Sequence, residues 1–352
     1  MDFTLGERLR LLPGPIMVTG HTGFKGTWLT FLLEHLQVPV VGFSLAPEVD
    51  SLFDRAKRIN AIPEVFADIR NIQALTRFMS KHQPSAVIHM AAQPLVLESY
   101  ETPRQTFETN VLGTVNVLDS AFHHESVKAV IAVTTDKVYR NDNLSHAFVE
   151  SDALAGNDPY SASKVGTEAA VSAWQQIAKV SGGPKVISVR AGNVIGGGDW
   201  AKNRLMPDLV RSFIAGEPIQ IRNPQSTRPW QHVLDPLRGY LMAMEAIFGG
   251  AEFSSLNFGP SGDGLSVKEV VDLGISCWPE NAGFSLDNNV QDCTPEATDL
   301  QINSLASKAL LDWEPRWSQQ EAIFATISWW RRVLKESHGT EEACRLDINS
   351  IL

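Results

Sequence analysis

Cysteine is scarce in this 352-residue chain, which has three. Cys277, Cys293 and Cys344 stand far apart and lack the paired spacing of a metal site, so we expect reduced thiols and no metal centre. Basic residues are outnumbered as well, since 30 Lys and Arg face 40 Asp and Glu for a net charge of −10. Nucleic acids and anionic membranes attract basic surfaces, so this balance argues against both as partners.

Long apolar runs are also missing, because none approaches the roughly 18–20 residues of a membrane span. Charged residues interrupt the apolar part of segment 1–15, which therefore does not read as a secretory signal. We expect a cytoplasmic protein without a membrane partner. The sequence contains no internal repeat, and its 43 % of hydrophobic residues can fill the core of one large or two modest domains.

Short apolar runs alternate with helical patterns in the first half of the chain. The runs are continuous rather than alternating, which is typical of strands covered on both faces. Residues 25–37 have the helical period, with Trp28, Leu29, Leu32, Leu33 and Leu36 on one face. The pattern predicts an α/β fold with a doubly wound parallel sheet of the Rossmann type. The predicted strands lie within residues 15–20, 38–45, 86–92, 129–135 and 185–196.

The alternation becomes irregular after about residue 195. Residues 204–216 and 233–248 predict helices, and residues 218–223 and 254–260 predict short strands. We expect residues 1–195 to form a Rossmann domain. Residues 196–352 should mostly form a smaller α/β region, interleaved with the first and laid over the ligand edge of the sheet.

The segment VTGHTGFKG places Gly20, Gly23 and Gly26 between the first strand and the first helix. Glycines allow a tight turn and a close approach of backbone to a pyrophosphate, which the helix N-terminus attracts. The context indicates a dinucleotide site; the alternative is a purely structural glycine-rich turn. The residues expected at this site are Gly20, Thr22, Gly23, Phe24, Lys25, Gly26, Ser44, Asp68, Ile69, Ala91, Ala92, Gln93, Tyr160 and Lys164.

The end of the second predicted strand departs from the usual fingerprint. Ser44 stands where an acidic residue commonly bonds the adenosine ribose, and no Arg is present there for a ribose phosphate. The absence of an acidic residue weakens the assignment of NAD as cofactor slightly, and the absence of an Arg means that NADP is not favoured either. Asp68 is a candidate for the adenine amino group, with a helix N-cap as an equal alternative.

The segment DPYSASK sets Tyr160 and Lys164 four residues apart, on one face of a predicted helix. A nearby ammonium favours a phenolate, so we expect the pKa of Tyr160 to fall from about 10 toward neutrality. Tyr160 would then be a base for an alcohol proton.

Six motifs now carry a family resemblance: TGHTGFKG, AAQPLV, TDK, DPYSASK, RAGNVIGGGDW and RPWQHV. Together, over residues 14–330, they resemble the extended short-chain dehydrogenase/reductase superfamily and, within it, the CDP-glucose 4,6-dehydratases of bacterial deoxysugar pathways. The last two motifs are much more specific to the sugar-nucleotide dehydratase branch than the first four, which occur nearly throughout the superfamily. The resemblance implies NAD as cofactor, a nucleotide-diphosphate hexose as substrate, and a lyase that removes water.

The resemblance also implies roles at the end of the fourth long apolar run. Hydride leaves C4 while Tyr160 takes the hydroxyl proton, water is lost across C5 and C6, and hydride returns to C6. Thr135 would bond the C4 oxygen, and a protonated Asp136 would donate to the departing hydroxyl. Lys137 would take the C5 proton or, alternatively, act as a fixed cation. The alternative is that Asp136 and Lys137 form a solvated ion pair in a surface loop without a catalytic role.

A diphosphate needs local cations in an acidic protein. The residues expected to bind substrate are Asn193, Arg204, Arg222, Arg228, Trp230 and Gln231, although each Arg could be a solvated surface charge. We interpret His232 as a packing residue, and His21 and Lys25 as parts of the cofactor loop.

One departure from the resembled family concerns the substrate. Those enzymes carry an Arg directly after AAQPLV, where this chain has Leu97 and Glu98. The alternatives are therefore a dehydratase for a dTDP-, GDP- or UDP-linked sugar, a nucleotide-sugar 4-epimerase, and a non-catalytic NAD-binding regulator. Residues 106–122 and 161–178 predict long helices that pair across a homodimer in the resembled enzymes; alternatively, they pack only on the sheet.

Overall fold

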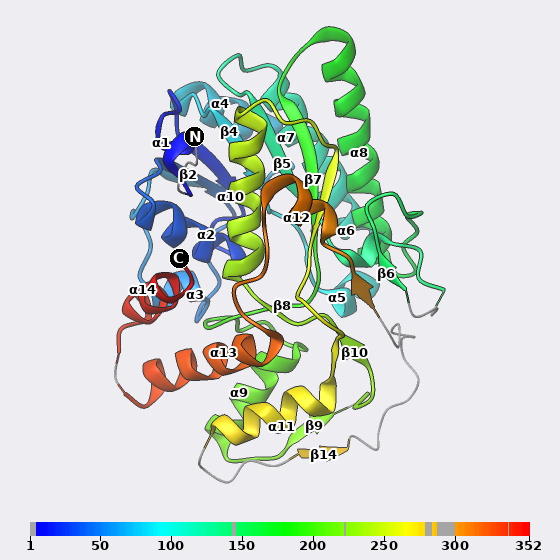
Figure 1. Ribbon diagram of the computed structural model, residues 1–352. Helices are drawn as coiled ribbons and strands as arrows, with labels where there is room; N and C mark the ends of the chain where they lie inside the picture. The colour runs from blue at the N-terminus through cyan, green and yellow to red at the C-terminus, as the bar shows by residue number, and fades with distance from the viewer. Residues whose placement is uncertain (1–4, 143–145, 222, 279–283, 287–299, 337) are drawn as a thin grey trace.

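A seven-stranded parallel sheet forms the centre of the protein (Figure 1). The computed structural model describes residues 5–142, 146–221, 223–278, 284–286, 300–336 and 338–352, so Arg222 and Cys293 lie outside the described residues. The strand order is β12-β7-β5-β4-β1-β2-β3, which confirms the doubly wound sheet. The strands are β1 (Ile16–Thr19), β2 (Val40–Ser44), β3 (Glu64–Phe66), β4 (Ala86–His89), β5 (Ala129–Val133), β7 (Lys185–Ala191) and β12 (Ser255–Phe258).

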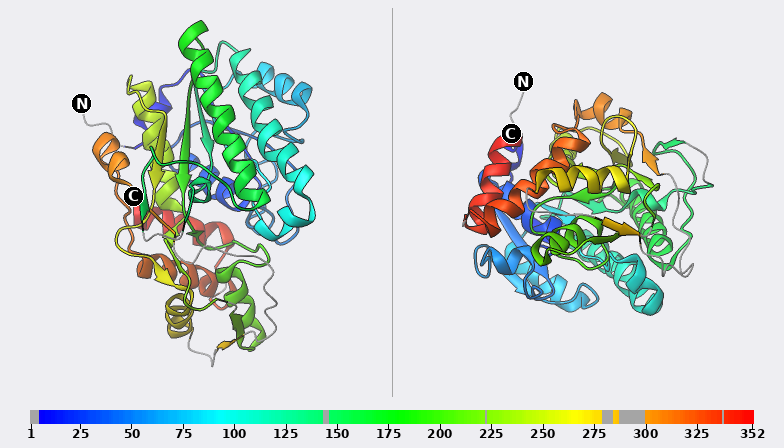
Figure 2. Two further views of the ribbon diagram at one scale, coloured as in Figure 1. Left: turned by 90° about the vertical axis from the view of Figure 1, so that its right-hand side faces the viewer. Right: turned by 90° about the horizontal axis from the view of Figure 1, so that it is seen from below.

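Helices cover both faces of this sheet (Figure 2). One core joins the sheet to α2 (Phe24–His35) and α10 (Leu234–Phe248), and a second joins it to α4 (Ile72–His82), α7 (Gly113–Phe122) and α8 (Pro159–Ser181). Successive strand residues alternate between the two cores: Val18 faces the first and Met17 the second. This two-sided burial explains why the strands are continuously apolar.

Short helical elements lie between these strands and helices. They are α1 (Glu7–Arg10), α3 (Leu52–Arg55), α5 (Val96–Glu101), α6 (Pro103–Phe107), the π-helix η1 (Glu108–Leu112) and the 3₁₀ turn η2 (Asp136–Val138). Residues 103–122 therefore form a nearly continuous rod, as the sequence predicts, although its middle turn is a π-helix.

A smaller lobe lies below the carboxyl edge of the sheet (Figure 1). It contains α9 (Leu205–Ala215), α11 (Val267–Cys277) and α13 (Gln319–Leu334), together with the two-stranded pairs β8 (Val194–Ile195) with β11 (Gln231–His232), β9 (Ile219–Ile221) with β14 (Phe284–Leu286) and β10 (Thr227–Arg228) with β13 (Leu265–Ser266). A further pair, β6 (Ala147–Phe148) with β15 (Gln301–Ile302), lies beside the sheet, where Phe148 accepts a hydrogen bond from Asn257 of β12.

The two parts interleave along the chain. Both β12 and α10 follow residue 195, yet they belong to the sheet and its covering layer, and α12 (Leu305–Leu311) packs beside them. The division at residue 195 stays a prediction, because no single boundary separates the two sets of elements.

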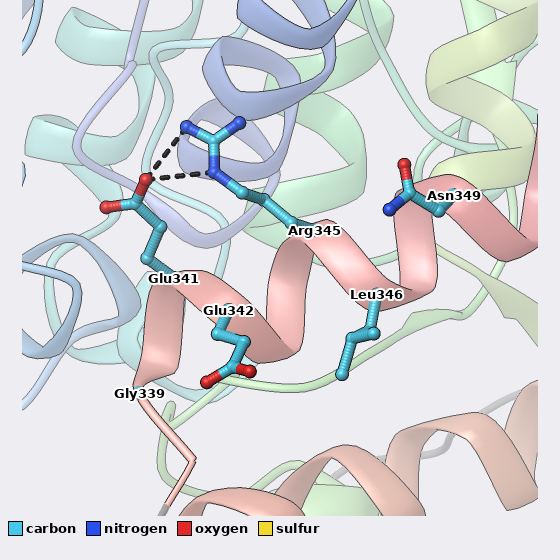
Figure 3. A pocket seen from close by; sticks show the side chains of 6 residues that line it. All are labelled: Gly339, Glu341, Glu342, Arg345, Leu346 and Asn349. Atoms are coloured by element: carbon cyan, nitrogen blue, oxygen red, sulfur yellow. Dashed lines mark hydrogen bonds and ion pairs between the residues drawn. The ribbon is translucent and has the colours of Figure 1, made fainter.

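The C-terminal segment, from which the sequence yields nothing, folds as α14 (Thr340–Ile351). It packs against α2 and α13 and buries Ala343, Cys344 and Ile348. Its outward side bears an open hollow, where Arg345 pairs with Glu341 (Figure 3). Cys277 and Cys344 are free thiols, and none of the described helices has the length and apolarity to cross a membrane.

The glycine-rich segment after β8 fixes the smaller lobe to the first helix. The indole of Trp28 in α2 donates to the carbonyl of Gly197 at 3.0 Å, and the ring of Trp329 in α13 covers the same glycine. A Cβ atom at Gly197 would lie 2.0 Å from that ring, so only glycine fits between the two helices.

We therefore predict that Gly197→Ala destabilises the protein by about 1–3 kcal/mol, the usual range for an overpacked core. Denaturant unfolding would measure the change. Gly339→Ala is the matched control, because a Cβ there meets no atom within 4 Å. It should cost less than about 1 kcal/mol, the scale of a weaker helix N-cap. Equal losses in both variants would contradict the packing argument.

Candidate active site

The turn from β1 into α2 is shaped by three glycines with different surroundings. Gly20 adopts a φ of 75°, and a Cβ there would lie 2.8 Å from the backbone nitrogen of Ala91. A Cβ at Gly26 would lie 2.1 Å from the carbonyl oxygen of Gly20. Gly23 is different, because its Cβ would meet only that same oxygen, at 3.3 Å. The turn is thus closed at Gly20 and Gly26 and open at Gly23.

The open position stands at the start of α2, a helix of 12 residues. Gly23 is its N-cap and offers no side-chain acceptor, so the first N–H groups, including those of Phe24 and Lys25, have no side-chain cap. Free N–H groups and the positive end of a helix dipole suit a pyrophosphate. The residues present therefore fit the phosphates of a dinucleotide.

The adjoining strand ends carry the remaining residues expected at the cofactor. Ser44 ends β2, and its hydroxyl bonds that of Thr22 at 2.7 Å, which ties the loop to the second strand. Asp68 follows β3 and binds the guanidinium of Arg70, whose hydrogen bonds hold the pKa of Asp68 below its ordinary value. The helix-cap alternative for Asp68 is wrong, because Asn71 caps α4.

Behind the loop, Ile69 is buried and closely approached by Gly113. Ala91 and Ala92 are half-buried where β4 ends. Gln93 is fixed by Leu95 and Asn110, since its backbone N–H donates to Asn110 Oδ1 at 2.8 Å and its Oε1 accepts the Leu95 N–H at 2.7 Å.

His21 is buried inside the same loop and bonds Glu64 of β3 at 2.7 Å. Its ring stacks against Phe66. Burial lowers the pKa of His21, although the Glu64 carboxyl opposes the change. His21 therefore braces the loop against β3, as expected for a member of the cofactor loop.

Beyond β5 the chain makes the 3₁₀ turn η2. The hydroxyl of Thr135 donates to Asp136 Oδ1 at 3.0 Å and accepts the Lys137 N–H at 3.3 Å. Asp136 is 1 % exposed, and its Oδ2 has no hydrogen-bond partner within the described part of the chain. Burial raises the pKa of this carboxyl, while Lys137 and the Thr135 bond oppose the rise. Asp136 is therefore not a solvated loop residue, and it retains its proton to higher pH than an ordinary aspartate.

Helix α8 brings Tyr160 and Lys164 to the same edge. It starts with a capping box between Asp158 and Ser161, with Pro159 in its first turn, so the strong start fixes where Tyr160 lies. The N–H of Tyr160 donates to the Ser99 hydroxyl at 3.1 Å. Both Tyr160 and Lys164 are buried.

The predicted lowering of the Tyr160 pKa is wrong for this geometry. Burial raises the pKa of Tyr160 to about 12, against a hydrogen bond with Thr135 that lowers it. The ammonium of Lys164 donates to the Val133 carbonyl at 3.2 Å, and burial lowers the pKa of Lys164 to about 8. The lysine is therefore held by backbone, which the i, i+4 spacing alone could not reveal.

Three cations from other elements act on the cluster formed by Asp136, Tyr160 and Lys164. Arg228 of β10 is buried and its charge acts on Asp136. Arg204 pairs with Asp199 at 3.1 Å, and its charge acts on Tyr160. Lys25 interacts electrostatically with Arg204, Lys164 and Asp136, and burial lowers the pKa of Lys25 to about 8. Lys25 thus lies near the Asp136 and Lys164 side chains as well as belonging to the glycine loop.

The other expected substrate residues lie deeper. The indole of Trp230 is buried and donates to the Leu265 carbonyl at 3.0 Å, and the Gln231 amide donates to the Phe258 carbonyl at 2.8 Å. Asn193 is half-buried and accepts the Gln231 N–H at 3.0 Å. His232 is fully buried with Trp28 and Trp317 edge-on to its ring, which agrees with a packing role.

Two further features were not resolved by sequence reasoning. Glu168 and Arg190 form a buried ion pair behind the cluster, and the only sequence signal is that Glu168 stands four residues after Lys164. In α5, Leu97 is half-buried and Glu98 is exposed. These residues stand where the resembled enzymes carry an Arg, and the Glu98 carboxylate lies toward solvent.

Residues 16–259 match the sequence model of the NAD dependent epimerase/dehydratase family. The chain belongs to this family. It is 41 % identical over 323 residues to the CDP-glucose 4,6-dehydratase of Salmonella typhimurium, covering 89 % of each chain. It is 26 % identical to the UDP-glucose 4-epimerase of Halalkalibacterium halodurans, covering 93 % of this chain and 98 % of that relative.

Solved structures of the family have the same fold. The UDP-glucose 4-epimerase of Thermotoga maritima, solved with UDP-glucose, has a TM-score of 0.78 at 22 % identity, covering 91 % of this chain and 100 % of that one. The dTDP-glucose 4,6-dehydratase of Bacillus anthracis, solved with NAD, has a TM-score of 0.76 at 21 % identity, covering 92 % and 98 %.

The different surroundings of two loop glycines predict different defects. In Gly23→Ala the new methyl group should enter the open space before α2 and weaken NAD binding at least about tenfold, or about 1.4 kcal/mol, with little effect on folding. In Gly26→Ala the methyl group meets backbone, so folding itself should suffer. Titration calorimetry with NAD and thermal unfolding would separate the two, and wild-type NAD affinity in Gly23→Ala would refute this interpretation.

Proposed function

We propose that this protein is an NAD-dependent nucleotide-sugar 4,6-dehydratase, a hydro-lyase that converts CDP-D-glucose to CDP-4-keto-6-deoxy-D-glucose. The observation that carries the proposal is Asp136, a buried carboxyl whose pKa is raised by burial, on the same turn as Lys137 and near Tyr160. Loss of water requires an acid for the departing hydroxyl, and a carboxyl that keeps its proton can provide one. The choice of CDP-glucose rests on the 41 % identity to the Salmonella enzyme of that name.

The glycine loop would hold the pyrophosphate of NAD, with Ser44 and Asp68 toward the adenosine and Tyr160 and Lys164 toward the nicotinamide. When bound, NAD supplies an acceptor for the hydrogen of C4 and a donor of that hydrogen to C6. Ser44 in place of a ribose-binding carboxylate leaves a hydroxyl as the polar group at this strand end.

The protein side chains would move the protons. Tyr160 removes the proton of the C4 hydroxyl, and Thr135 hydrogen-bonds the C4 oxygen. The resulting ketone acidifies the C5 proton, which Lys137 takes, or which leaves to another base while Lys137 stabilises the enolate as a cation. Asp136 then donates its proton to the C6 hydroxyl, which departs as water. Because burial raises the pKa of Tyr160, its basic form needs stabilisation from the nearby cations.

Cations near the cluster would bind the substrate diphosphate. Arg204 and Arg228 reach it from the smaller lobe, and Lys25 reaches it from the glycine loop. We assign Arg222 to the same group from its sequence position alone. Asn193, Trp230 and Gln231 would line the nucleotide side by shaping the β8 and β11 pair rather than by direct charge.

A nucleotide-sugar 4-epimerase is the alternative, because the fold is shared with epimerases. An epimerase would use Tyr160 but would need no acid for water loss. The buried Asp136, whose pKa is raised by burial, favours the dehydratase. We further propose a cytoplasmic enzyme of deoxysugar biosynthesis, since the product is a 4-keto-6-deoxy sugar nucleotide.

Incubation with CDP-, dTDP-, UDP- and GDP-hexoses tests this proposal. A 4-keto product absorbs strongly in alkali and, after water loss, is 18 mass units lighter (about the mass of water). We predict such a product from CDP-glucose. Asp136→Asn should lower its rate by about 10²–10⁴-fold, the usual contribution of a general acid. A wild-type rate in Asp136→Asn would exclude that role, and absence of any 4-keto product from all four would exclude the function.

We also propose a homodimer. The rod of α6 and η1 packs along α8, and it leaves Phe107 41 % and Leu112 56 % exposed, with Tyr100 of α5 nearby in sequence and 44 % exposed. Large apolar side chains on neighbouring turns are typical of an interaction surface. A second copy of the same rod and α8 would cover them, as in the resembled enzymes.

Leu112→Arg should therefore convert a dimer to a monomer, because a buried interface cannot accommodate an unpaired guanidinium. Sedimentation velocity at micromolar concentration would measure the change. Leu11→Arg is the control, since Leu11 is 77 % exposed beside α1 on the other side of the sheet (Figure 1). A monomeric wild type, or dimers of both variants, would disprove the proposed surface.

A further inference from the structure

A buried ion pair lies directly behind the candidate catalytic turn. The guanidinium of Arg190 in β7 grips the carboxylate of Glu168 in α8 through Nε and Nη2, both at 2.9 Å. Each side chain is 5 % exposed. Removing two charges from water is costly unless every polar atom finds a partner, so the surrounding hydrogen bonds decide whether the pair is tolerated.

The Glu168 carboxylate is fully bonded. The Thr134 hydroxyl donates to Oε1 at 2.5 Å, and the Ser188 hydroxyl donates to Oε2 at 2.7 Å. Burial opposes ionisation, but the hydrogen bonds and charge of Arg190 prevail and hold the pKa of Glu168 below its ordinary value. Glu168 is therefore a carboxylate at neutral pH, and it joins α8 to the end of β5 and to β7.

Arg190 also bonds a residue on the far flank of η2, the turn that carries Asp136 and Lys137. Its Nη1 donates to the Tyr139 hydroxyl at 2.9 Å, which in turn donates to Asn257 Oδ1 at 2.7 Å. The Asn257 amide is bonded to the Phe148 carbonyl at 2.9 Å. Thr134 and Tyr139 stand immediately outside residues 135–138, so the Glu168–Arg190 pair holds both flanks of the turn that carries Asp136 and Lys137.

Glu168 also stands one helical turn after Lys164, on the same face of α8. Burial lowers the pKa of Lys164, and within the described residues Glu168 is the one charge that raises it appreciably. Other groups that face Lys164 are Lys25 of α2 and His89 of β4. His89 is neutral, since burial lowers its pKa to about 3.

The remaining charges around α8 do not replace Glu168. Asp136 of η2 is buried with a raised pKa, and Arg190 of β7 is neutralised by Glu168 itself. The charged residues of α5, α6, η1 and α7 are exposed or half-buried; they are Glu98, Glu101, Arg104, Glu108 and Asp119.

We propose that Glu168 is a positioning residue with two linked effects: it clamps the flanks of the catalytic turn through Thr134 and Arg190, and it keeps the Lys164 side chain charged beside Tyr160. The first effect fixes where Asp136 and Lys137 lie. The second keeps a buried cation on the helical turn that follows Tyr160. This inference rests on the proposed function for its consequence in turnover, but the state of Lys164 can be measured without turnover.

The sign of the effect follows from the charges. A carboxylate near an ammonium favours the protonated form, so loss of the Glu168 charge lowers the pKa of Lys164. Lys164 would then lose its proton at a lower pH. If turnover needs the ammonium, the fall in kcat/KM at alkaline pH also moves to lower pH.

Carbon-13 NMR of full-length protein labelled at lysine Cε tests the inference directly. The Lys164 signal is identified by its loss in Lys164→Arg, and its titration midpoint is compared between wild type and Glu168→Gln. We expect the midpoint to fall by about one pH unit or more, the usual effect of an adjacent opposite charge. The alkaline limb of kcat/KM with CDP-glucose should move in the same direction.

Ser188→Ala is the matched control, because it removes one hydrogen bond to Glu168 and keeps the carboxylate. Its midpoint should equal that of the wild type. Should Glu168→Gln not fold, the double variant Glu168→Gln/Arg190→Met removes both charges together and should also show a lowered midpoint, by less than the single variant because the repelling Arg190 charge is gone as well. An unchanged midpoint without Glu168, or an equal fall in Ser188→Ala, would overturn the inference. Failure of the wild type to convert any sugar nucleotide would instead remove the proposed function and leave the NMR result intact.

Discussion

The burial of the Asp136 carboxyl at the carboxyl edge of a parallel sheet is the constraint around which this site is organised. A carboxyl in that position costs free energy when ionised, so it favours its protonated form. Its Oδ1 accepts the Thr135 hydroxyl, and its Oδ2 has no partner in the described part of the chain. A buried carboxyl with a raised pKa and an oxygen that lacks a partner is suited to donate a proton to a substrate, and this property favours the proposed dehydratase over an epimerase.

The fold explains how such a group can be held. Parallel strands covered on both faces must end at one edge, and β1, β4 and β5 deliver the glycine loop, Gln93 and the Thr135–Lys137 turn to neighbouring positions there. The smaller lobe closes over the same edge with Arg204 and Arg228. Behind the turn, the Glu168–Arg190 pair joins α8, β5 and β7. The turn that buries the Asp136 carboxyl is thus held in place by a second carboxylate, that of Glu168, both of whose oxygens have hydrogen-bond partners.

Much of this arrangement was predictable from the sequence because it depends on local patterns. Continuous apolar runs revealed strands with two buried faces, and the glycine spacing with its flanking strand and helix located the turn. The placement of Tyr160 and Lys164 one helical turn apart on α8 followed from helical spacing. The surroundings of the catalytic side chains could not be predicted from these local patterns. The direction of the Tyr160 pKa depends on its burial, and Lys164 is held by a backbone carbonyl 31 residues away along the chain. The partners of Glu168 come from positions 20, 22 and 34 residues away, which no single sequence pattern connects. Likewise, α14 is a helix because α2 and α13 receive its apolar face.

The most direct test follows one hydrogen atom through the reaction. CDP-glucose carrying deuterium at C4 is incubated with the wild-type protein and NAD, and the product is examined by NMR. The account predicts a 4-keto product whose deuterium has moved to the C6 methyl group. Formation of a 4-epimer that keeps deuterium at C4, or of no 4-keto product at all, would contradict the claim that this site is that of a dehydratase.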